Sequence, residues 1–247
     1  MDFLIILQTF FLSYGAFAIY GLAAAALCGW LLCKKAHIPP MKLLPFLVLG
    51  LVPLYLGAKG FGILSLCAYR VNIGRPLDWT VVENSGIVFY GGLLGFLLYA
   101  RLAVPIYMKE QAPDSLGIAA VCIPLFHTFA RVGCYFGHCC YGILSSASLW
   151  TGFYEGRVPV QLMEAGFNLL LFGLLLYLFM KKPAYRGRLP RLYLLLYACF
   201  RLGDECIRGD AIRGFIGPLS FSQWVSMGIL LYLLLTALTS SRRQKNT

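Results

Sequence analysis

The chain has 247 residues, of which 60% are hydrophobic and 13% are charged, and its mean hydropathy is +0.75. An ordinary soluble domain carries about 25% charged residues, so this composition excludes a disordered chain, a collagen, a coiled coil and almost any soluble enzyme. A polytopic membrane protein remains. In such a protein, the net charge of +11 indicates basic cytoplasmic loops and anionic headgroups rather than nucleic acid.

Apolar segments of the length needed to cross a bilayer, about 20 residues, recur along the chain. Seven are predicted as transmembrane helices, roughly Tyr14–Cys33, Lys42–Cys67, Gly86–Ile106, Leu116–Phe136, Val160–Met180, Leu192–Cys206 and Leu219–Leu238. The sixth is short and carries charge. The N-terminal stretch FLIILQTFFL is too short to span and lacks a basic region, so we expect it to stay in the mature protein, at the interface or re-entrant. The fold class is therefore an all-α polytopic integral membrane protein, with one domain over residues 1–247.

The distribution of lysine and arginine predicts the orientation in the membrane. Thirteen of these residues lie in the loops that follow the first, third, fifth and seventh segments, and five lie in the other loops. We therefore expect the N-terminus outside and the C-terminus in the cytoplasm.

Ionisable residues also fall within or at the edges of the spans, where each costs several kcal/mol unless it is paired or faces water. They are Lys59, Arg131, Glu164, Arg201, Asp204 and Glu205. They could neutralise one another as structural pairs. A buried polar site that holds a charged substrate is the favoured interpretation.

The sixth segment places Tyr197, Arg201 and Glu205 at i, i+4 and i+8, on one helix face that Arg208 continues. An arginine there suits bidentate binding of phosphate, although an internal Arg–Glu pair could also simply fix packing. In the fourth segment, Arg131 stands one turn before a glycine-rich exit. Two such arginines could hold the phosphate of one phospholipid headgroup.

Tyrosines and cysteines allow several interpretations. Tyr90, before a glycine pair, and Tyr20 could be aromatic-belt anchors or could contact a substrate. The nine cysteines do not suggest a disulfide framework. The cluster Cys134, His138, Cys139 and Cys140 could be a structural loop, which is favoured, or a reactive thiol, or a metal site. Because CxxC spacing is absent and adjacent cysteines rarely bind one ion together, we predict no metal and no cofactor.

Taken together, these motifs resemble the prolipoprotein diacylglyceryl transferase family over nearly the whole chain. The matching stretches are IYGLAAAA, GIVFYGGLLG, ARVGCYFGHCCYG, VPVQLMEA, YACFRLGDE and LSFSQWVSMGILL. The resemblance implies an enzyme of the bacterial plasma (inner) membrane that moves diacylglyceryl from phosphatidylglycerol to the lipobox cysteine thiol of a preprolipoprotein.

The resemblance also implies roles for particular residues. It implies catalytic Arg131, Arg201 and Tyr90, and substrate-binding Tyr20, Tyr197, Glu205, Gly142, Gln161 and Glu164. The arginines would stabilise charge on the leaving phosphate.

The chain departs from the family pattern around one loop. Tyr90 stands where many members have histidine, and Val158 stands where they have the histidine before the proline of VPVQLMEA. Cys134, Gly137 and Cys139 replace two asparagines and a glutamate of the signature. These changes suggest a divergent subgroup, and two alternatives stay open: a paralogue that uses the same lipid site for another acceptor or headgroup, and a non-catalytic lipid-binding membrane protein.

Overall fold

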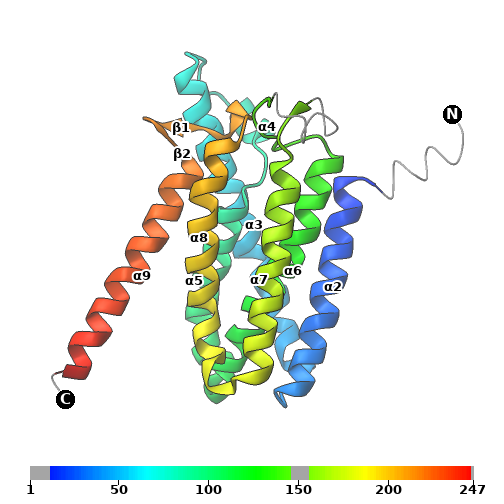
Figure 1. The fold of residues 1–247 in the computed structure, drawn as a ribbon, viewed down its shortest axis with the longest axis vertical. Helices are drawn as coiled ribbons and strands as arrows, with labels where there is room; N and C mark the ends of the chain where they lie inside the picture. The colour runs from blue at the N-terminus through cyan, green and yellow to red at the C-terminus, as the bar shows by residue number, and fades with distance from the viewer. Residues whose placement is uncertain (1–11, 146–155, 246–247) are drawn as a thin grey trace, which may run out of the picture. The chain divides into compact units, whose positions relative to one another are not determined.

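The computed structural model describes residues 12–145 and 156–245, which fold mainly as long helices (Figure 1). Two compact units make up the chain. Unit 1 comprises Met1–Pro40, Glu110–Pro190 and Cys206–Asp210, and unit 2 comprises Met41–Lys109, Arg191–Glu205 and Ala211–Thr247. The N-terminal stretch FLIILQTFFL lies outside the described residues except for its last leucine, Leu12. That the chain forms one domain stays a prediction.

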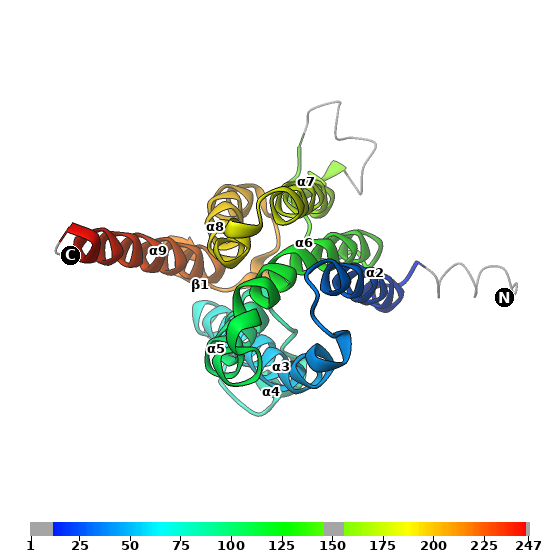
Figure 2. The ribbon, with the colours of Figure 1, turned by 90° about the horizontal axis from the view of Figure 1, so that it is seen from below.

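Unit 1 is a layer of three long helices, α2 (Tyr14–Lys35), α6 (Ala112–Phe136) and α7 (Val160–Lys181). Helix α6 packs against both others and lies between them, as the end-on view in Figure 2 shows. The short 3₁₀ helices η1 (Lys109–Gln111) and η3 (Pro183–Arg188) flank them, and η3 packs on α6 and α7. Half of the most apolar stretch of α6 is buried, so this helix forms the centre of unit 1.

Local sequence explains where the helices of unit 1 begin and end. The side chain of Ser13 accepts a hydrogen bond of 3.2 Å from the backbone nitrogen of Ala16, which caps α2. Lys34 and Lys35 lie in the last turn of α2, where a positive charge interacts favourably with the negative end of the helix dipole. Pro113 stands in the first turn of α6, where a missing backbone N–H costs nothing.

Unit 2 contains the remaining long helices and a small hairpin. The helices are α3 (Pro40–Asn72), α4 (Thr80–Asn84), α5 (Phe89–Tyr107), α8 (Leu189–Ile207), the 3₁₀ helix η4 (Ala211–Arg213) and α9 (Phe221–Lys245). The antiparallel strands β1 (Phe215–Ile216) and β2 (Leu219–Ser220) pair Phe215 with Ser220 and Ile216 with Leu219. The hairpin leads directly into α9.

Close backbone approach holds α3 against α5 in unit 2. A Cβ built on Gly57 of α3 would overlap the carbonyl oxygen of Gly91 of α5, and one on Gly91 would overlap the carbonyl oxygen of Gly57. Small residues commonly allow this approach between membrane helices. Because Tyr90 neighbours Gly91, this contact fixes the start of α5 against α3.

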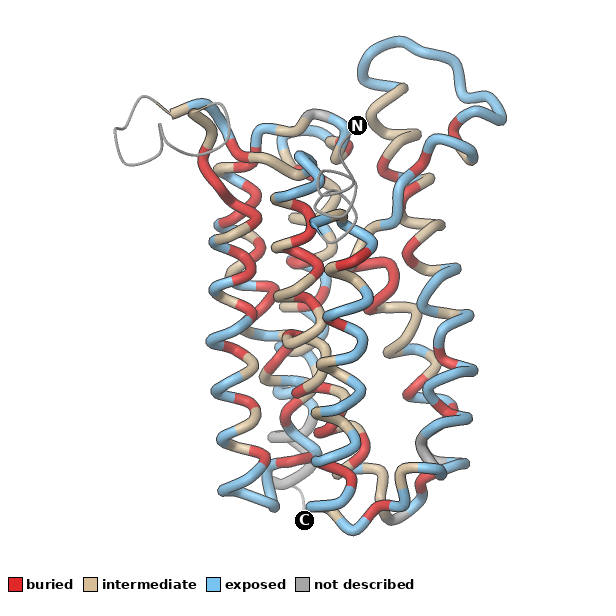
Figure 3. Tube along the Cα trace, turned by 90° about the vertical axis from the view of Figure 1, so that its right-hand side faces the viewer, coloured by how far each residue is buried: buried red, intermediate tan, exposed pale blue. Residues whose placement is uncertain are grey.

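Burial in the structure differs from that in a soluble protein, because many large apolar side chains lie outside while several polar and charged ones are buried among the apolar core. Leu170 is 76% exposed, whereas Asn168 on the same helix is 0% exposed. Figure 3 shows buried and exposed positions interleaved along the helices. An apolar surface of this kind suits contact with lipid tails rather than water.

Each of the seven predicted segments lies largely within a helix, although the third begins before α5 and the seventh begins in β2. Within residues 12–145 and 156–245, five helices are long and apolar enough to cross a membrane, and the apolar stretch Phe89–Val104 of α5 is shorter. Helix α8 carries buried charge, as the sixth segment did in the sequence. The prediction of an all-α multi-pass membrane protein is thus confirmed, and the orientation stays a prediction.

Candidate functional site

A buried ion-pair cluster joins α6 to α7 in unit 1. Nε of Arg131 lies 2.7 Å from Oε2 of Glu164, and Nε2 of His127 lies 3.6 Å from Oε1 of the same carboxylate. His127 and Arg131 stand one turn apart on α6, so both reach α7 from one face. All three side chains are buried. The carboxylate thus compensates a guanidinium that would otherwise be very costly in an apolar surrounding.

His127 is not among the site residues predicted from the sequence. Its spacing of i, i+4 to Arg131 in HTFAR was the available signal, because such a pair shares a helix face. Arg131 and Glu164 are both predicted site residues, but their pairing could not be predicted, because they lie on different helices.

The loop after α6 turns back toward the helix that it leaves. Helix α6 ends at Phe136, so Cys134 lies in its last turn and His138 lies beyond it. His138 and Cys140 adopt left-handed backbone conformations, with φ of 51° and 58°. Nε2 of Gln161 on α7 donates a hydrogen bond of 2.7 Å to the carbonyl oxygen of Cys139. Gln161 therefore holds the loop against α7.

Gly142 is the position at which this loop meets the segment Cys206–Asp210, which belongs to the same unit. It pairs with Arg208 in an antiparallel bridge, and its backbone nitrogen donates to the carbonyl oxygen of Val158 at 3.1 Å. A Cβ on Gly142 would overlap that oxygen and lie 2.9 Å from Cβ of Val158. The crowding explains why glycine occurs here. Arg208 in turn binds Asp210 through two hydrogen bonds of 2.8 and 2.5 Å.

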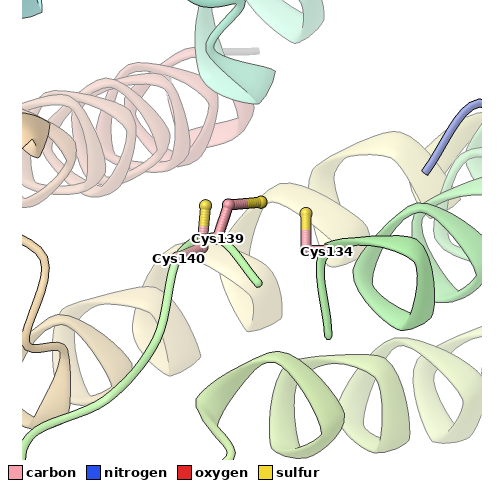
Figure 4. Close-up of side chains that lie close together, drawn as sticks. All are labelled: Cys134, Cys139 and Cys140. Atoms are coloured by element: carbon pink, nitrogen blue, oxygen red, sulfur yellow. The ribbon is translucent and has the colours of Figure 1, made fainter. Parts of the chain in front are cut away.

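Three thiols gather where the loop returns to α6. The sulfur atoms of Cys134, Cys139 and Cys140 all lie within 4.8 Å of one another (Figure 4). Hydrogen bonds from Cys134 and Cys139, together with the positive charges of Arg131 and Arg208, hold the pKa of the Cys140 thiol well below its usual range. Hydrogen bonds with Cys134 and Cys140, and burial, raise the pKa of Cys139. Cys140 is thus the thiol of this cluster whose pKa is lowered, whereas that of Cys139 is raised.

Unit 2 holds a second buried network, at the end of α8. Arg201 contacts Asp204 through Nη1 and Glu205 through Nη2, each at 2.5 Å. Nη1 of Arg213 lies 3.4 Å from the other oxygen of Glu205. The predicted pairing of Arg201 with Glu205 is confirmed. Two arginines and two carboxylates here balance in formal charge, which makes their burial tolerable.

Aromatic rings line the neighbouring part of unit 2. The hydroxyl of Tyr90 on α5 and that of Ser226 on α9 are 2.6 Å apart. The Tyr90 ring contacts that of Tyr197 on α8, with centroids 5.5 Å apart, and Tyr193 stacks on Tyr197 at 5.8 Å. Tyr90 is 2% exposed. An aromatic-belt anchor lies at the protein surface, so this burial disfavours that alternative for Tyr90.

The structure thus sorts the predicted site residues by unit. In unit 1, Arg131, Glu164, Gln161 and Gly142 belong to the α6–α7 cluster and its adjoining loop. Tyr20, on α2 of the same unit, is 37% exposed and makes an edge contact with Phe17 at 5.7 Å. In unit 2, Arg201, Glu205, Tyr197 and Tyr90 share the end of α8 and the start of α5. Their catalytic and binding roles stay predictions.

Comparison with known proteins agrees with these motifs. The family model described as prolipoprotein diacylglyceryl transferase matches residues 4–239. A phosphatidylglycerol–prolipoprotein diacylglyceryl transferase of Clostridium tetani is 27% identical over 87% of each chain. The enzyme of that name from Oleidesulfovibrio alaskensis is 28% identical over 89% of this chain and 83% of its own. One from Teredinibacter turnerae is 30% identical over 70% of this chain and 65% of its own.

Proposed function

Since the chain belongs to the prolipoprotein diacylglyceryl transferase family, we propose that it transfers diacylglyceryl from phosphatidylglycerol to the lipobox cysteine thiol of a prolipoprotein. The names of the relatives supply the two substrates. The bacterial sources of those relatives, together with the apolar helices, support a place in the plasma (inner) membrane.

The observation that carries the proposal is the burial of Arg131 in an otherwise apolar helix layer. Its guanidinium is held by Glu164 at 2.7 Å and is 8% exposed with the rest of the residue. A charge kept at membrane depth is a functional-site hypothesis by default, because it is expensive to maintain. Arginine presents a planar fork of donors that matches phosphate oxygens in pairs.

The reaction needs a cationic group such as the Arg131 guanidinium beside the leaving phosphate. The acceptor thiol loses its proton, and the thiolate attacks the glyceryl carbon that carries the phosphate ester. A C–S bond forms, the C–O bond breaks, and the electron pair leaves with glycerol phosphate. Negative charge therefore develops on the phosphate, where a fixed cation stabilises the transition state more than the ground state. We assign this role to Arg131.

We assign the Arg201 network of unit 2 to binding of the same phospholipid, because it too contains a buried arginine that can bind phosphate. Asp204 and Glu205 hold Arg201 in one orientation, at 2.5 Å each, so little side-chain freedom is lost on binding an anion. Tyr197 and Tyr90 supply phenol groups in the same unit, suited to orienting a lipid by hydrogen bonding. That Arg131 and Arg201 hold one phosphate stays a prediction.

The test is transfer by the full chain, reconstituted in phosphatidylglycerol vesicles with a peptide that carries a lipobox cysteine. Mass spectrometry measures lipidated peptide and an enzymatic assay measures released glycerol phosphate. Arg131→Lys keeps the charge but loses the fork, and we expect transfer to fall by about 100-fold or more. Arg101→Lys, at an exposed position of α5, should retain the wild-type rate.

Two results would overturn the proposal. One is the absence of product from wild-type chain that is folded and inserted, combined with failure to rescue a strain depleted of its own transferase. The other is full activity in Arg131→Lys, which would remove the proposed mechanism even if transfer occurs.

A second candidate function is transfer from the same lipid to another thiol acceptor. It is favoured by the loop beside Arg131, where cysteines stand in place of signature side chains. In that case the wild-type chain would release glycerol phosphate with small thiols but would leave the lipobox peptide unmodified.

A further inference from the structure

The three thiols beside Arg131 have the arrangement of a metal-binding site. Cys134 comes from the end of α6 and is buried, Cys140 is half-buried, and Cys139 is exposed. A tetrahedral zinc ion with Zn–S bonds of about 2.3 Å places its sulfur ligands about 3.8 Å apart. The observed limit of 4.8 Å between these sulfur atoms is close enough for small side-chain rotations to reach that spacing. The exposure of Cys139 provides an entry path.

The backbone brings the thiols together by a turn that ordinary loops avoid. Two non-glycine residues, His138 and Cys140, adopt left-handed conformations, each costing about 1–2 kcal/mol. The backbone nitrogen of Cys139 donates to the carbonyl oxygen of Cys134 at 3.1 Å, and Gln161 holds the carbonyl oxygen of Cys139 from α7. Strain that the surroundings maintain in this way is typical of functional loops.

Charge around the cluster also suits a bound cation with thiolate ligands. Zinc with three thiolates carries a net charge of −1. Nη1 of Arg131 lies 4.0 Å from the sulfur atom of Cys134, so a guanidinium N–H group is already in place to donate a hydrogen bond to a thiolate ligand, while Nε of Arg131 faces Glu164. Outer contacts of this kind orient ligands and tune a metal site.

The sequence predicts no metal, because adjacent cysteines rarely bind one ion together, but the three sulfur atoms converge in the structure. We therefore propose that Cys134, Cys139 and Cys140 form a three-thiolate zinc site whose fourth coordination position is left to an external ligand. Within the described ranges, the group comprises these three cysteines and no histidine or carboxylate. Soft thiolate ligands favour zinc over harder ions. Zinc sites with three protein ligands keep a position for water or substrate.

The fourth coordination position of the zinc would bind the acceptor thiol, and this consequence rests on the proposed function. A thiol that binds zinc loses its proton, here to water, and the bound thiolate is the nucleophile. It would attack the glyceryl carbon, form the C–S bond and release glycerol phosphate with the electron pair of the broken C–O bond. Zinc neither gains nor loses electrons in this step.

The metal test uses purified full chain under reducing conditions, with no lipid or peptide, so its result is independent of transfer activity. Elemental analysis after dialysis against zinc should find about one zinc ion per chain. Cadmium in its place should produce an ultraviolet thiolate-to-metal charge-transfer band. The triple variant Cys134→Ser, Cys139→Ser, Cys140→Ser should lose both signals, and Cys199→Ser, at an exposed cysteine of α8, should keep them.

A single variant guards against misfolding of the triple one. Cys139→Ser lies on the exposed loop and should weaken zinc binding by at least about 10-fold, while circular dichroism stays that of wild type. Zinc content that is equal in wild type and in the folded variants, or a preference for copper, would overturn the site. A cobalt-substituted chain whose visible spectrum does not shift on adding a thiol peptide would overturn the open fourth position.

Discussion

At the scale of single residues, Glu164 holds unit 1 together by compensating Arg131. It lies 2.7 Å from Arg131 and 3.6 Å from His127, and it is 1% exposed. Glu164→Gln would remove the negative charge and leave the buried guanidinium of Arg131 without a compensating carboxylate. Breaking one partner of a buried pair costs about 3–5 kcal/mol, so we expect a clear fall in the midpoint of unfolding measured in detergent.

The control for this change is Glu83→Gln, the same substitution at an exposed position of α4, which should leave the midpoint unchanged. The double variant Arg131→Met, Glu164→Met should recover most of the lost stability, because neither charge remains, yet it should not transfer lipid. A wild-type midpoint in Glu164→Gln would show that the pair does not stabilise unit 1.

Local spacing decided which of these residue contacts could be predicted from sequence. Arg201 and Glu205 lie four positions apart on one helix, so their pairing followed from helix geometry. Arg131 and Glu164 belong to different helices, and no spacing relates them. The three thiols are brought together by the left-handed residues His138 and Cys140, a conformation that a β-carbon disfavours and that a sequence therefore does not suggest.

At the scale of elements, the contact of α3 with α5 depends on Gly57. A methyl group there would overlap the carbonyl oxygen of Gly91, which is backbone and cannot rotate away. Gly57→Ala should therefore separate the two helices and cost about 1–3 kcal/mol of unfolding free energy. It should also weaken transfer, because Tyr90 adjoins the contact.

Gly60 provides a matched control for this change on the same helix. A Cβ on Gly60 would meet nothing within 4 Å, so Gly60→Ala should be neutral or stabilise α3 by up to about 1 kcal/mol. Equal unfolding midpoints for the two alanine variants would show that close backbone approach does not hold α3 against α5.

At the scale of the whole molecule, hydropathy located the helices well because lipid imposes one rule on every span. Each backbone polar group must be satisfied within the helix, so long apolar runs such as Val160–Lys181 become helices regardless of their neighbours. Helix α8 is less apolar because it carries charged residues, and Arg201 pairs there with Asp204 and Glu205. It was nevertheless predicted among the apolar segments, as the short and charged sixth one.

The orientation of the chain in the membrane is the remaining whole-molecule prediction, and it depends on the excess of thirteen basic residues over five in alternate loops. Cysteines introduced at exposed loop positions test it. Ala184→Cys, between α7 and α8, should react with a membrane-impermeant maleimide only after the cells are permeabilised. Leu77→Cys, between α3 and α4, should react in intact cells. Labelling is measured above that of the parent chain, and the opposite pattern would mean that the chain is inserted with its N-terminus in the cytoplasm.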